Sequence, residues 1–418
     1  MHKKKYNTKL FILFLSFLLG DFFLVTRIIT ANDNNYNNTS ENLNQDYLSS
    51  NKKLNKQYFI SHSSFKIPTK SSVIVNNKIK LYNQIFDKKE YLIASPENFN
   101  PSLNDTFINP ESRDLQTNEI NRFKIESITP SFYLDSDNFG QENIYREILL
   151  NFQSPNQNNF NLRTGINSFR KTDIEDINHI PLIFGWQKQL NNTNLNLNVG
   201  VDFFDRIRNS PNLSVSVEQP LSINIEEDGA LQSLFVAGAT VEHQAYKFNA
   251  TTIENEVTLW RFRPQFYWLI APDISLFSFA QYGSFSDGNH EFQSFSRLEK
   301  TLGEFSLSGN LFIWSFAQNL ENSSGYFSPP DFLVYNLELA WKKQFTDSLI
   351  CRLAASFGQQ RLEGEFSDAF VYEGLCQATL FPRTVLDLSY RVSNILTVEG
   401  DATSYRNEQL KAQVKYSF

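Results

Sequence analysis

The last nine residues of the chain, 410–418, alternate between apolar and polar side chains. Leu, Ala, Val, Tyr and Phe occupy the even positions, and Lys, Gln, Lys and Ser occupy the odd positions between them. Because successive side chains of a strand point to opposite faces, one face of this segment is apolar and the other polar. Such a strand, ending the chain on an aromatic residue, is typical of the closing strand of an outer-membrane β-barrel. The alternative is an ordinary sandwich strand that happens to end the chain.

The same alternation recurs from residue 119 onward, with turn signals about every 15 to 20 residues. The outer faces of a soluble sandwich carry more Lys and Glu than these segments do. The pattern therefore predicts an all-β protein, a transmembrane antiparallel β-barrel of about sixteen strands. The clearest further examples are residues 194–203, 213–218, 305–313, 336–342, 349–357 and 386–392.

The connections between the predicted strands alternate in length, as expected for short periplasmic turns and longer outer loops. An even number of strands leaves both chain ends in the periplasm, and sixteen strands leave an aqueous channel where eight would be filled by side chains. The long connections are predicted at 316–330, 359–369 and 393–406. The tight connections are predicted at 153–158, 189–193, 226–229, 300–303, 345–347 and 381–382.

The parity of each strand predicts which side chains face the lumen, because a shift of one residue would turn every apolar partner away from lipid. The predicted pore-lining residues are Asn194, Asn196, Asn198, Asn310, Asn336, Glu338, Arg352, Asp387, Arg391, Lys411 and Lys415.

The N-terminus differs from the rest of the chain. Lysines at positions 3, 4, 5 and 9 precede an apolar run from residue 10 to 20, and small residues follow at 30 and 31. This pattern predicts a cleaved signal peptide, residues 1–31, with a retained anchor as the alternative. Residues 32–117 are rich in Asn, Ser, Asp and Lys and carry only short apolar patches at 73–75 and 91–93, which predicts a disordered periplasmic arm. The barrel is predicted over residues 118–418.

Composition agrees with a chain that meets both lipid and water. Aromatic residues make up 15% and apolar residues 41% of the chain, less than a helical membrane protein needs. Removing the signal peptide takes away five basic residues and one acidic residue, so the formal charge falls from −7 to −11. An acidic chain without a basic stripe disfavours nucleic acid as a partner. The two cysteines, Cys351 and Cys376, are predicted to face outward on neighbouring strands. They are either two small lipid-facing residues or, alternatively, the partners of a disulfide.

The sequence carries little sign of catalytic chemistry. Beyond the signal peptide its histidines are His62, His179, His243 and His290, without a metal-ligand spacing or a nucleophile motif. We expect no catalytic residue, no metal and no cofactor. A lipid-modifying barrel enzyme would place a serine beside a histidine on the outer surface, and the candidates are His243 and His290 with Ser286.

Two segments resemble a known family. Residues 325–332 read Gly-Tyr-Phe-Ser-Pro-Pro-Asp-Phe, and residues 282–290 read Tyr-Gly-Ser-Phe-Ser-Asp-Gly-Asn-His. They are similar, in the same order, to the G-Y-F-S-P-Q-x-Y/F and Y-x-D-F-S-D-G-N-R segments in the C-terminal barrel of the cellulose synthase operon protein C family. The resemblance covers residues 260–418, and more loosely 120–418. The residues of this loop motif are Ser286, Asp287, Gly288, Asn289, Gly325, Tyr326, Phe327, Ser328 and Pro329.

The resemblance implies a sixteen-stranded outer-membrane porin through which a growing exopolysaccharide leaves the cell. In that family a tetratricopeptide scaffold precedes the barrel, whereas residues 32–117 contain no such repeat. The expected partners are therefore outer-membrane lipid, a polysaccharide, and a periplasmic scaffold or synthase complex supplied by another protein. The alternative functions are a general or solute-specific diffusion porin and, from another class, a lipid-modifying barrel enzyme or structural outer-membrane protein.

The aromatic residues of the loop motif suit three roles. Tyr326 and Phe327 offer flat faces for sugar rings, for the membrane interface or for packing within a plug that folds into the barrel.

Overall fold

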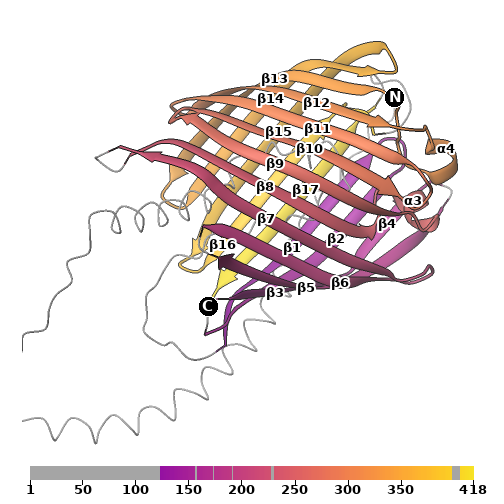
Figure 1. The fold of residues 1–418 in the computed structure, drawn as a ribbon, viewed down its shortest axis with the longest axis horizontal. Coiled ribbons are helices and arrows are strands. Elements are labelled where there is room, and N and C mark those ends of the chain that lie inside the picture. The colour runs from indigo at the N-terminus through magenta and orange to yellow at the C-terminus, as the bar shows by residue number, and fades with distance from the viewer. Residues whose placement is uncertain (1–122, 156–157, 173, 191, 227–229, 398–404) are drawn as a thin grey trace, which may run out of the picture. The chain divides into compact units, whose positions relative to one another are not determined.

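In a computed structural model, the described residues are 123–155, 158–172, 174–190, 192–226, 230–397 and 405–418, and they form one closed antiparallel barrel. The first strand, β1, pairs with both β2 and the last strand, β17, so the sheet has no free edge. The strands cross the barrel at a common tilt, and β17 lies beside β1 (Figure 1). The predicted signal peptide and arm lie outside the described residues.

The wall has sixteen strand positions, as predicted, because β3 and β4 form a single position between β2 and β5. The register continues across their interruption, which places Pro181, a residue without a backbone N–H, opposite Gly165. The strands are β1 Lys124–Asp137, β2 Glu142–Gln153, β3 Asn159–Gly165, β4 Asn167–Lys171, β5 Ile174–Leu190, β6 Thr193–Phe204, β7 Ser210–Ile225, β8 Leu231–Ala245, β9 Thr258–Ala271, β10 Ile274–Phe285, β11 His290–Leu302, β12 Phe305–Phe316, β13 Phe332–Thr346, β14 Leu349–Leu362, β15 Glu365–Phe381, β16 Thr384–Ser393 and β17 Asn407–Ser417.

The two ends of the barrel differ in their connections. The end that carries the C-terminus has the short turns, and the opposite end has the three longest connections, 246–257, 317–331 and 394–406 (Figure 1). Two short helices, α3 (Ala250–Glu254) and α4 (Glu321–Ser324), lie at this second end. In the part of the chain that the structure describes, no helix is long and apolar enough to cross a membrane.

One predicted long connection is wrong. Residues 359–369 were expected to form an outer loop, but β14 runs to Leu362 and β15 begins at Glu365, so a two-residue turn joins them. Glu363 and Gly364 both adopt positive φ, at 51° and 94°, the geometry of a tight hairpin turn. The polar residues that suggested a loop belong to strand ends that extend beyond the apolar alternation.

The two faces of the wall follow the predicted parity. In β13, Leu337 and Leu339 are 65% and 56% exposed on the outer face, whereas Glu338 between them is 6% exposed. Cys351 and Cys376 lie opposite each other on β14 and β15, on the same outer face as Leu353, and form a disulfide. Of the two alternatives for these cysteines, the structure has the bonded pair.

Candidate functional site

A band of paired charges crosses the inner wall from β11 to β15. Arg297 donates to Glu338 at 2.9 Å and to Glu299 at 2.6 Å. Glu338 also accepts a hydrogen bond from Arg352, which lies 3.6 Å from Glu373 on the next strand. Because each cation lies between anions, this part of the lumen offers many hydrogen-bonding groups without a field of one sign.

The other predicted pore-lining residues lie on the same inner face as this band. Asn310 donates to Asn336 at 2.8 Å, directly across β12 and β13. Asp387 accepts hydrogen bonds from Gln377 at 2.9 Å and Gln413 at 3.0 Å. Arg391 lies opposite Glu373 in the register, and by strand parity Lys411, Lys415, Asn194, Asn196 and Asn198 face inward from β17 and β6.

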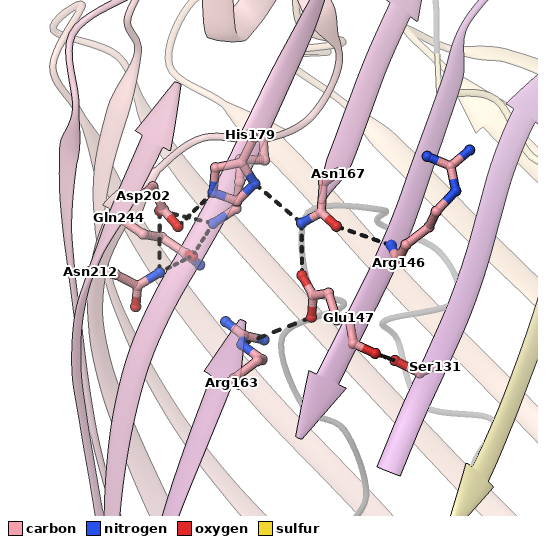
Figure 2. Close-up of polar contacts among 10 residues, drawn as sticks. Ser131, Arg146, Glu147, Arg163, Asn167, His179, Asp202, Asn212 and Gln244 are labelled. Atoms are coloured by element: carbon pink, nitrogen blue, oxygen red, sulfur yellow. Dashed lines mark hydrogen bonds and ion pairs between the residues drawn. The ribbon is translucent and has the colours of Figure 1, made fainter. Parts of the chain in front are cut away.

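A second polar network lies on the opposite part of the inner wall, around His179 of β5 (Figure 2). The Nε2 atom of His179 lies 2.8 Å from Asp202 Oδ1, and its Nδ1 atom lies 3.2 Å from Asn167 Nδ2. The amide of Asn167 also donates to Glu147 at 2.7 Å. Since an amide nitrogen can only donate, His179 Nδ1 accepts and Nε2–H donates to Asp202, which assigns a neutral imidazole.

The same network attaches one of the long connections to the wall. Lys247, in the 246–257 connection, donates to Asp202 at 3.1 Å and to Gln244 at 3.2 Å. Asn212 also reaches Asp202 and Gln244, each at 3.3 Å. Asp202 therefore binds a charged side chain of the loop and two neutral donors of the wall at once.

A large apolar cluster fills the inner side of the barrel beneath the long loops. It joins residues of the wall, such as Phe312, Trp314 and Phe332, to residues of the loops, such as Tyr246, Phe248 and Leu396. Beside it, Glu291 accepts hydrogen bonds from Arg261 at 2.6 Å, Gln281 at 3.0 Å and Trp314 at 3.1 Å. The long loops thus fold inward and pack against the wall.

The two halves of the loop motif lie against each other. Tyr326 donates its hydroxyl hydrogen to Asp287 at 2.9 Å and accepts from Asn289 at 3.1 Å. Burial raises the pKa of the Tyr326 phenol, which therefore stays a protonated donor. The glycine at 288, with φ of 89°, forms the turn that places these side chains.

The remaining residues of the motif fix the backbone of the loop. Gly325 ends α4 at φ of 81°, and a Cβ atom there would lie 2.2 Å from Thr251 of the neighbouring loop. Ser328 Oγ accepts from the backbone N–H of Leu320 at 2.7 Å, and the Pro329 carbonyl accepts from Phe316 at 2.9 Å. Ser286 Oγ accepts from the Thr258 N–H at 2.9 Å.

Tyr326 and Phe327 are 0% and 1% exposed, so their ring faces contact protein. Phe285 stacks on Tyr326, with ring centroids 5.3 Å apart, and Trp314 meets Phe327 edge-on at 5.7 Å. Three roles were possible for these two aromatic residues, namely contact with sugar rings, contact with the membrane interface and packing. In the structure they pack inside the folded loops.

The candidate serine and histidines of a barrel enzyme have other partners. His243 stacks on Trp260 and bonds the Leu259 carbonyl at 2.8 Å. His290 stacks on Tyr282, whose hydroxyl lies 3.1 Å from its Nδ1 atom. Among the described residues, no cluster of side chains suited to a metal ion occurs.

Sequence reasoning missed the most highly connected inner residues, namely Arg261, Glu291, Arg297, His179, Asp202 and Lys247. Asp202 has the parity of the asparagines that precede it in β6 and could have been found by extending that alternation. Lys247 lies in a loop, where no periodicity indicates the direction of a side chain.

Comparisons with known proteins agree with the predicted resemblance. A model of the family "Cellulose synthase operon protein C C-terminus" matches residues 294–416, which include the 325–332 segment and the charged band. No curated protein matches the chain in sequence. The predicted similarity to the C-terminal barrel of this family is confirmed.

Among solved structures, a bacterial polysaccharide outer membrane secretin has the same fold, with a TM-score of 0.56 and 11% identity over 72% of this chain and 99% of that one. CdiB from Acinetobacter baumannii matches with a TM-score of 0.46 and 8% identity over 71% of this chain and 66% of that one. The outer membrane protein OprD from Pseudomonas aeruginosa matches with a TM-score of 0.38 and 9% identity, over 70% of this chain and 94% of that one. The chain therefore has the fold of an outer-membrane β-barrel and, over residues 294–416, is similar to the C-terminal part of the cellulose synthase operon protein C family.

Proposed function

We propose that this barrel exports an exopolysaccharide across the outer membrane. The observation that carries the proposal is the charge-paired inner band of Arg297, Glu338, Arg352 and Glu373, which lies within the segment that matches the family. An extended glycan presents hydroxyl groups around its circumference, so its path needs donors and acceptors on the wall. Because the charges of this band compensate each other, its wall suits a neutral glycan better than a charged solute.

The inward-folded loops support the same function. A passive opening at the outer end would pass small solutes at all times, whereas loops packed on the wall restrict the exit until a cargo displaces them. A periplasmic scaffold or synthase complex, encoded separately, would then deliver the polymer to the inner end.

The experiment that tests export compares a strain lacking the gene with its complemented strain. We expect secreted polysaccharide to disappear in the deletion strain while polymer accumulates in the periplasm, and the purified barrel to show weak ion selectivity. Unchanged secretion, or a strongly charge-selective pore, would instead favour the diffusion porin.

A substitution separates the role of the wall from the presence of the barrel. Glu338→Lys places a third cation between Arg297 and Arg352, and we expect it to reduce export and make the pore anion-selective. Glu365→Lys makes the same change of charge at the exposed first residue of β15 and is the matched control. Equal export by the two variants, at equal amounts of folded barrel, would contradict a role for the charged band.

A further inference from the structure

An apolar patch lies on the inner wall at the periplasmic end of β7, β8 and β9. Leu234 and Val236 are each 1% exposed at its centre. They have the same parity in β8 as the inward-facing Gln244, whereas Phe235 points outward and packs on Trp268. The side chains that complete the patch are Ile223, Leu231, Tyr267 and Leu269.

This patch differs from the rest of the inner wall. Further along the same strands toward the outer end, the inward residues are polar, among them Thr240, Gln244 and Arg261. An apolar surface on the wet side of a barrel is unfavourable unless another segment covers it. The neighbouring side chains bury Leu234 and Val236, whereas the side chains around these two are only partly buried and leave apolar surface facing the lumen, where another segment could cover it.

We propose that residues 73–86 of the same chain dock on this patch. The chain enters the barrel at the same end, since Phe123 precedes β1 beside the turn from β2 to β3, and the Phe418 amide donates to the Glu126 carbonyl at 3.0 Å. The occupant and the patch are thus connected through the periplasmic mouth.

The linking chain is long enough to reach. Residues 87–122 number thirty-six, and they span up to about 120 Å when extended and about 35 Å as a flexible coil. In the strand order β8 lies six of the sixteen positions around the barrel from β1, so the link has to cross only one barrel mouth.

The chemistry of the segment fits the patch. Val73-Ile74-Val75 and the stretch 79–86, which contains Ile, Leu, Tyr, Ile and Phe, are separated by Asn76-Asn77-Lys78. Short apolar stretches of this kind in an otherwise polar arm are suited to docking on a preformed apolar wall.

The test measures the accessibility of the patch in the full mature chain, purified in detergent without other proteins. A Val236→Cys variant is labelled with a water-soluble maleimide, in the native chain and in a chain whose Val73, Ile74, Val75, Ile79 and Leu81 are replaced by Ser. Ser348→Cys, in an exposed periplasmic turn, is the control. We expect the arm substitutions to speed labelling at 236 by about tenfold or more and to leave labelling at 348 unchanged.

Equal labelling at 236 in both chains, whether fast or slow, would overturn the proposal. Protection that appears only when periplasmic proteins are added would assign the patch to a separate partner and would also overturn it. A gel-shift assay of the folded barrel confirms that each variant is folded. None of these outcomes depends on whether the barrel exports a polysaccharide.

Discussion

Asp202 shows how single residues of the inner wall hold a loop in place. It lies on β6 and accepts hydrogen bonds from His179 at 2.8 Å and from Lys247 of the 246–257 loop at 3.1 Å. A hydrogen bond to a charged group typically contributes about 1.5–3 kcal/mol. The contact is therefore strong enough to bias this loop toward the wall.

Replacing Lys247 by Met should loosen the 246–257 loop, because the side-chain length is kept and only the charged contact is lost. We expect backbone amides of this loop to exchange hydrogen about tenfold faster or more, which corresponds to about 1.4 kcal/mol or more. Lys247→Arg, which keeps the charge, is the control. Unchanged exchange in the Met variant would mean that apolar packing alone holds the loop.

Two substitutions at Tyr326 distinguish the contribution of its buried ring from that of its hydrogen bond to Asp287. Tyr326→Phe keeps the buried ring and should destabilise the loops by about 1 kcal/mol, whereas Tyr326→Ala leaves a cavity and should cost about 3–5 kcal/mol. Both are measured by urea unfolding of the barrel together with secreted polysaccharide. Normal export by the Phe variant and reduced export by the Ala variant would agree with a packing role.

At the scale of the strands, a disulfide links two neighbouring strands of the wall covalently. Cys351 and Cys376 face each other on β14 and β15, with 25 residues of sequence separation. Closing a loop of this length restricts the unfolded chain and stabilises the fold by about 3–4 kcal/mol. We expect Cys351→Ser with Cys376→Ser to lower the urea midpoint of unfolding. Equal midpoints of the double variant and the native chain, both without reductant, would show that the bond does not form in the cell.

The inward direction of Arg352 in β14 stays a prediction for the protein in the membrane. A water-soluble probe should react with Arg352→Cys and not with Leu353→Cys, because neighbouring residues of a strand face opposite sides. Labelling is done in vesicles, with the native disulfide intact. A reversed pattern would place the polar residues of this strand against lipid.

At the scale of the whole molecule, closure of the barrel depends on the contact of its first and last strands. β17 pairs with β1 from Asn407 to Ser417, and the Tyr416 and Phe418 rings meet edge-on at 5.0 Å. Deleting Phe418 should reduce the amount of folded barrel in the outer membrane far more than deleting residues 32–60, because only the first deletion removes part of the closing seam. Heat-modifiable gel mobility of membrane fractions measures the folded amount. Equal insertion of both variants would count against this role of the terminal strand.

The sequence alone determined the class of fold, the number of strands and the direction of most wall residues. It did so because a membrane barrel imposes one repeated constraint, lipid on one side and water on the other, on every strand. The inward direction of Glu338 follows from its position between Leu337 and Leu339, without any knowledge of the residues on adjacent strands. The family resemblance could be recognised for a different reason, because residues 325–332 follow the order of residue types in the family's segment.

Only the tertiary structure decided what the side chains contact. Arg297 and Glu338 are 41 residues apart in sequence, and the ion pair follows from the stagger of β11, β12 and β13. The inward folding of the 246–257 and 317–331 loops, the burial of Tyr326 and the tether through Lys247 have no periodic signal, because loop residues contact whichever surfaces the fold brings near them. The strands are set by a local alternation, whereas the outer end of the channel is set by contacts between segments far apart in the chain.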